Sequence, residues 1–66
     1  MPYRVIAERL LAEWREADRR LSQLSADSPE AEVLRATIAR VRMEYQRAID
    51  GARREHLPEP PPFPRG

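Results

Sequence analysis

The sequence predicts an all-α fold: an antiparallel hairpin of two helices that pair along a coiled-coil-like apolar seam, followed by an extended proline-rich tail. Two observations support this prediction. Apolar residues repeat at steps of three and four over residues 2–25 and 29–56, and residues 57–66 hold five of the seven prolines. Steps of three and four place side chains on one face of a helix, whereas strands alternate at every second residue. We therefore expect one helical domain, residues 1–56, and a tail.

The first predicted helix covers residues 2–25. This segment is rich in strong helix formers and has no glycine or proline after Pro2, which occupies a position where proline is tolerated. Its apolar residues step by four and three and so share one face. We expect this face to supply half of the core seam, namely Tyr3, Ala7, Leu10, Trp14, Ala17, Leu21 and Leu24.

Residues 26–28 are the predicted turn. Asp27 or Ser28 can accept a hydrogen bond from the free amides at the start of a second helix, and Pro29 suits the first helical position. A connection this short forces the two helices to run antiparallel.

The second predicted helix covers residues 29–56. Gly51 is unfavourable within a helix but does not end it, whereas Pro58 keeps Leu57 out of the α region and so stops the helix near His56. Its apolar face supplies the other half of the seam, namely Ala31, Leu34, Ile38, Val41, Tyr45, Ala48 and Ala52.

The two apolar faces match in register. In an antiparallel pair, the sequence numbers of facing residues add to a constant, and every layer of this seam satisfies that condition, from Leu24 opposite Ala31 to Tyr3 opposite Ala52. Most layers also place a large side chain against a smaller one, as close packing requires. One flanking pair, Glu13 opposite Glu44, brings like charges together.

Apolar residues outside the seam suggest self-association. A hairpin of this size has a small core and is marginally stable alone. We therefore expect a homodimer in which two hairpins form a four-helix bundle. The candidate interface residues are Val5, Ile6, Leu11, Val33, Met43 and Ile49. Two alternatives remain open at this stage: these residues are scattered surface side chains, or a different protein supplies the missing helices.

The proline-rich tail, residues 57–66, cannot continue the helix and favours a polyproline conformation. Three interpretations are open for it: a linear motif that docks on another protein, a strap in which Leu57 and Phe63 fold back onto an apolar face, or a disordered end. The candidate docking residues are Leu57, Pro58, Pro61, Phe63 and Pro64.

Composition argues against an enzyme. The chain has no cysteine, one histidine and two glycines, so it lacks a thiolate nucleophile, a histidine-rich metal site and a glycine-rich phosphate loop. Glu13 and Glu44 are the only candidates for apposed carboxylates, and no Glu-x-x-His motif accompanies them. We expect no catalytic residue, cofactor, metal or small-molecule substrate. No apolar run exceeds three residues, as in Val5 to Ala7, which is too short for a membrane span and favours a cytoplasmic protein.

The sequence thus favours a non-enzymatic protein–protein interaction or assembly module whose first partner is itself and whose tail is available to another protein. The alternative is a small nucleic-acid-associated regulator. Arg40, Arg47 and Arg54 recur every seven residues, with Arg53 beside them, and form a stripe of candidate phosphate contacts. The net charge of +1 and the lack of interleaved aromatic residues argue against this alternative.

Overall fold

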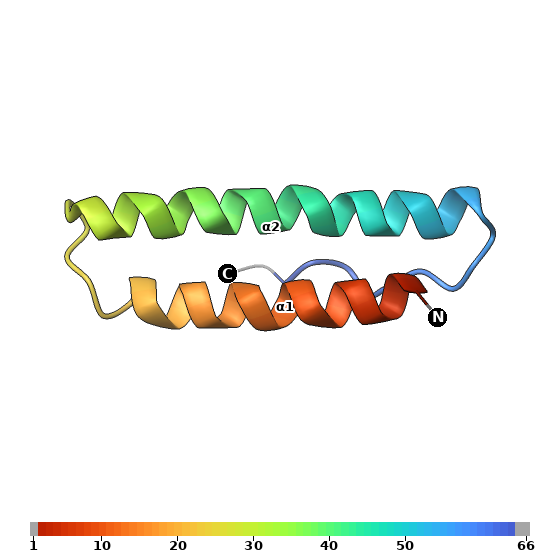
Figure 1. Ribbon diagram of the computed structural model, residues 1–66, viewed down its shortest axis with the longest axis horizontal. Coiled ribbons are helices and arrows are strands. Elements are labelled where there is room, and N and C mark those ends of the chain that lie inside the picture. Colours follow the sequence, from red (N-terminus) through yellow and green to blue (C-terminus); the bar gives the residue numbers. More distant parts are fainter. Residues whose placement is uncertain (1, 65–66) are drawn as a thin grey trace.

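The structure, a computed structural model, describes residues 2–64. Two helices, α1 (Pro2–Leu21) and α2 (Pro29–Arg54), lie side by side and antiparallel in a molecule 43 Å long (Figure 1). Residues 2–64 contain no strand. The predicted all-α hairpin is therefore confirmed. Neither helix in this part of the chain is both long and apolar enough to cross a bilayer.

The first helix is shorter than the sequence predicts. It ends at Leu21 and not at residue 25, and residues 22–27 form turns and bends. The Ser22 hydroxyl donates a hydrogen bond of 2.8 Å to the Arg19 carbonyl, so this serine bonds to the backbone of the last helical turn. Serine is a weak helix former for this reason. Leu24 consequently lies in the connection, where it is half-buried.

The start of α2 is capped by Ser28. Its hydroxyl accepts a hydrogen bond of 3.4 Å from the Ala31 amide, and Pro29 occupies the first helical position. Glu30 and Glu32 lie in the first turn, where the helix dipole favours negative charge. Polar capping and charge together fix the position of this helix end.

The second helix ends at Arg54 in a Schellman motif, slightly before the predicted end at His56. The Leu57 amide donates to the Ala52 carbonyl over 2.9 Å, and the His56 amide donates to the Arg53 carbonyl over 3.2 Å. His56 has a φ of 57°, in the left-handed region that glycine usually occupies in this motif. This turn reverses the direction of the chain.

The core is built from the seam: nine of its fourteen residues are buried and the other five are half-buried. Tyr45 and Val41 are the largest fully buried side chains. The buried seam residues are Ala7, Leu10, Ala17, Ala31, Leu34, Val41, Tyr45, Ala48 and Ala52. The half-buried seam residues are Tyr3, Leu21, Leu24, Trp14 and Ile38.

Gly51 makes room for Tyr3 at the end of the hairpin opposite the turn, where α1 begins and α2 ends. A Cβ atom at Gly51 would lie 2.7 Å from the Cε1 atom of Tyr3. The Tyr3 hydroxyl donates a hydrogen bond to the Glu55 carboxylate, and this bond raises the pKa of Tyr3. The glycine that is unfavourable for the helix thus allows close contact between the first turn of α1 and the last turns of α2.

The tail turns back from the end of α2 and runs beside the hairpin (Figure 1). Residues 57–64 form neither helix nor strand, and Pro60 is buried among them. The molecule therefore consists of two helices and a third segment that covers part of them.

Candidate functional site

The hairpin has two flanks, one on each side of the seam. Leu11 follows the seam residue Leu10, and Ile49 follows Ala48, so they project to one side. Ile6 precedes a seam residue and projects to the other side. We call the first side the tail flank, formed by Leu11, Trp14, Arg42, Tyr45 and Ile49. The second side is the open flank, formed by Ile6, Glu13, Val33, Arg40 and Glu44.

Phe63 is the main contact of the tail with the tail flank. Its ring centroid lies 5.5 Å from that of Trp14 and 5.3 Å from that of Tyr45, with interplanar angles of 73° and 68°. Edge-to-face arrangements at this separation are favourable because the ring edge is positive and the ring face negative. The Arg42 guanidinium lies 5.5 Å from the Phe63 centroid and adds a cation–π contact.

Tyr45 also anchors the tail backbone. Its hydroxyl donates a hydrogen bond of 2.5 Å to the Pro61 carbonyl. The Tyr45 residue has no solvent-exposed surface, and burial raises the pKa of its phenol. A buried hydroxyl needs a partner, and the tail provides one. Tyr45 therefore joins the core of the hairpin to the tail.

An ion pair ties the start of the tail to α2. Arg53 donates to the Glu59 carboxylate through two nitrogens, with Nη2–Oε1 at 3.0 Å and Nε–Oε2 at 3.3 Å. This hydrogen-bonded pair lowers the pKa of Glu59. Both side chains remain in contact with water, so their contribution to stability is modest compared with that of the aromatic contacts.

Two of the predicted interface residues, Leu11 and Ile49, lie on the flank that the tail contacts and are not fully accessible to a partner. Ile49, which the sequence places among the interface candidates, is buried in the core of the single chain at 7% exposure. Leu11 is half-buried and packs against the same core, together with Trp14 and Phe63. Ile49 is therefore unavailable to a partner, and Leu11 is available only in part.

The open flank keeps exposed apolar side chains. Ile6 is 44% exposed and Val33 is 64% exposed. Val5 and Met43, the other two interface candidates with high exposure, point away from the seam on the outer faces of α1 and α2. Of the six candidates, Ile6 and Val33 are thus the exposed residues on the open flank.

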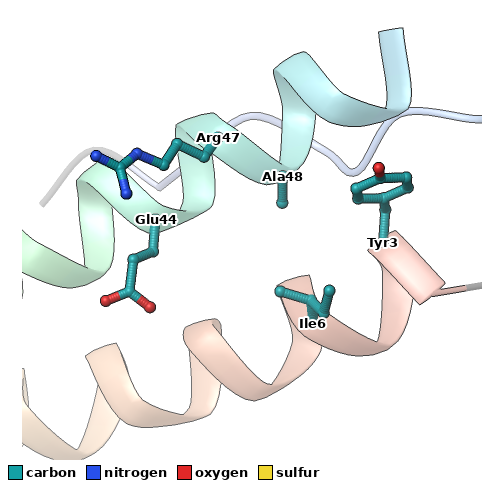
Figure 2. A pocket seen from close by; sticks show the side chains of 5 residues that line it. All are labelled: Tyr3, Ile6, Glu44, Arg47 and Ala48. Carbon is teal, nitrogen blue, oxygen red and sulfur yellow. The ribbon is translucent and has the colours of Figure 1, made fainter. Parts of the chain in front are cut away.

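Two surface depressions lie along the open flank. One, of about 290 Å³, is lined by Tyr3, Ile6, Glu44, Arg47 and Ala48. Figure 2 shows Tyr3 and Ile6 projecting from α1 toward Ala48 of α2 across this depression. The second, of about 360 Å³, is lined by Glu13, Glu16, Ala17, Arg20, Val33, Leu34 and Thr37. Both helices line both depressions.

Arg40 lies between the two carboxylates that the sequence places opposite each other. Its guanidinium is 2.7 Å from Glu44 and also donates to Glu13. The predicted repulsion between Glu13 and Glu44 is therefore replaced by a three-membered ion network. No group of three metal-ligating side chains occurs within residues 2–64.

The arginine stripe is not a row of free cations. Arg40 is engaged by Glu13 and Glu44, and Arg53 by Glu59. Arg47 lines the first depression, and Arg54 is exposed in the last turn of α2. A phosphate contact at Arg40 or Arg53 would have to displace a carboxylate, which weakens the nucleic-acid interpretation.

Two contacts at the tail flank were not predicted from the sequence: the hydrogen bond from Tyr45 to Pro61 and the contact of Arg42 with Phe63. The need of a buried tyrosine hydroxyl for a partner was a usable signal for the bond between Tyr45 and Pro61. No comparable signal marks Arg42, because an arginine on the surface of a helix is ordinary.

Comparisons of the chain with protein-family models, with curated proteins and with solved structures find no match.

Proposed function

We propose that this chain is a non-enzymatic protein–protein interaction module that self-associates through its open flank, two hairpins forming a four-helix bundle. The observation that carries this proposal is the unequal cover of the two flanks. Phe63 and the tail cover one, while Ile6 and Val33 remain exposed on the other.

The shape of the open flank supports a second hairpin as the partner. The depressions lie in the groove between α1 and α2, where a helix of another hairpin can place apolar side chains. A two-fold dimer uses the same surface on both copies, so each copy supplies both exposed side chains and depressions. The extended tail, on the opposite side, stays outside this interface.

Sedimentation of the full chain tests the proposal. We expect a species of twice 7.7 kDa at high micromolar concentration. Val33→Asp should shift it to the monomer, because a carboxylate in an apolar interface loses its hydration without a partner.

Val5→Asp is the matched control. Val5 has the same side chain as Val33, similar exposure at 55% and a similar place near a helix start, but lies on the outer face of α1. This variant should still dimerise. A wild-type protein that remains at 7.7 kDa, or equal effects of the two variants, would contradict the proposal.

A further inference from the structure

The contacts between the tail and the tail flank are those of a ligand on a recognition site. Proteins that bind proline-rich segments use aromatic grooves, which fit a preformed polyproline helix. Here Trp14 and Tyr45 form the aromatic surface, and the Tyr45 hydroxyl donates to the carbonyl of Pro61. The tail flank therefore has the chemistry of a site for a proline-rich segment that carries a phenylalanine.

The connection between this ligand and its own hairpin is short and strained. His56 alone has positive φ among the described non-glycine residues, and the chain reverses direction there. A left-handed conformation brings the Cβ atom of an L-residue close to the following carbonyl oxygen. Opening this turn would return His56 to an unstrained conformation.

We propose that the tail flank also accepts the tail of a second copy, so that two chains exchange residues 57–64. Exchange reproduces every contact of Phe63, Pro61 and Glu59 with identical partners, and it relieves the turn at His56. A foreign proline-rich segment lacks this advantage, because it must displace a tethered tail whose effective concentration is in the millimolar range.

Opening the turn directs the tail toward a neighbour. When His56 becomes helical, α2 continues past Arg54, and Pro58 still keeps Leu57 out of the α region. The tail then leaves from the end of the hairpin and no longer runs back along it. The exchange uses the flank opposite to the one proposed for bundle formation and does not depend on that bundle.

A titration with full-length Phe63→Ala tests whether the site binds in trans. This variant keeps the groove and weakens its own tail, and Trp14, the single tryptophan, reports occupancy. We expect a synthetic peptide of residues 57–66 to give a saturable change in Trp14 fluorescence. The same peptide with alanine at position 63 should give none, and the wild-type protein should need at least about ten times more peptide, because its tethered tail competes.

Two results of this titration would overturn the proposal. One is a helical Phe63→Ala protein that shows no saturable response up to about millimolar peptide. The other is an equal response to the peptide with and without phenylalanine. In both cases, a circular dichroism spectrum typical of helices must first show that the Phe63→Ala variant is folded.

Hinge variants test exchange between two copies. Both are made in the Val33→Asp background, which removes bundle formation. His56→Val should raise the dimer fraction, because a β-branched side chain strongly disfavours positive φ, and His56→Gly should lower it. The dimer should disappear when Phe63→Ala is added. If the His56→Val protein stays monomeric at millimolar concentration, or if its dimer survives Phe63→Ala, exchange of the tail is disproved.

Discussion

The two flanks of the hairpin start from similar sequence patterns and differ in what covers them. Each flank places a large aliphatic residue beside the seam, Ile49 on the tail flank and Ile6 on the open flank. Ile49 is 7% exposed, whereas Ile6 is 44% exposed. The tail lies on one side only, where Phe63 packs against the core cluster that contains Ile49. A segment without regular structure thus decides which side of the helices remains available to a partner.

The two flanks also differ in the kind of interaction that they contain. The tail flank is held by aromatic contacts and one buried hydroxyl, whereas the middle of the open flank holds the network of Glu13, Arg40 and Glu44. Aromatic contacts bury apolar surface, but exposed ion pairs leave it accessible. The open flank is therefore the surface that can still gain from burial.

The largest effect that separates the two flanks should come from Phe63→Ala. Loss of this half-buried ring should lower the free energy of unfolding by about 2 kcal/mol, because it uncovers Trp14 and Tyr45. Val33→Ala, on the open flank, should change it by less than about 0.5 kcal/mol in the monomer. Urea unfolding at low micromolar protein concentration measures the free energy of unfolding of both variants. Equal losses of free energy would show that the tail does not stabilise one flank more than the other.

Next in size is Tyr45→Phe. Removal of one hydroxyl should cost about 1 kcal/mol, since the Pro61 carbonyl loses its donor while the ring packing is kept. Tyr3→Phe is the matched control, and it should cost less because the Glu55 carboxylate is exposed to water. Thermal unfolding followed by circular dichroism compares the two. A larger loss for Tyr3→Phe would show that the tail is not anchored at Tyr45.

The fold was largely predictable from the sequence because its seam residues obey one register. The steps of apolar residues gave both helices, and Ser28 with Pro29 marked the start of the second. The early end of α1 was missed, since local hydrogen bonds of Ser22 compete with a propensity that still favoured a helix. Ser28 and Pro29 are specific local signals for a helix start, whereas no residue of comparable specificity marks the end of α1.

The candidate site was predictable only in part. The strap was one of three open interpretations of the tail, because proline fixes the local conformation but not the direction in which the chain leaves α2. That direction depends on His56 adopting positive φ, which is uncommon for a residue other than glycine. The contact of Arg42 with Phe63 follows from the path of the tail, so no local pattern could reveal it.

A smaller effect, of opposite sign, is expected from His56→Gly. Glycine adopts positive φ without strain, so the substitution should stabilise the closed tail by about 0.5 to 1 kcal/mol. Arg54→Gly is the control in the last turn of α2, where an exposed helical residue is replaced and glycine should destabilise. Melting temperatures of the two variants should move in opposite directions. If both fall, the left-handed turn at residue 56 is not part of the native state.

The smallest effect should be a dependence of tail closure on pH. The Arg53 guanidinium lowers the pKa of Glu59 below its ordinary value of 4.5 in the closed tail. The contribution of this pair is therefore complete above that value and is lost as the pH falls through the lowered pKa. Trp14 fluorescence between pH 7 and pH 2 should show this step, and Glu59→Gln should remove it. A step that persists in the variant would assign it to another carboxylate.

Nuclear Overhauser spectroscopy of the full-length protein tests most directly whether the tail covers one flank. We predict cross-peaks from the ring protons of Phe63 to those of both Trp14 and Tyr45, whose ring centroids lie 5.5 Å and 5.3 Å away. Phe63 resonances at random-coil positions, with no cross-peak to either ring, would contradict the account.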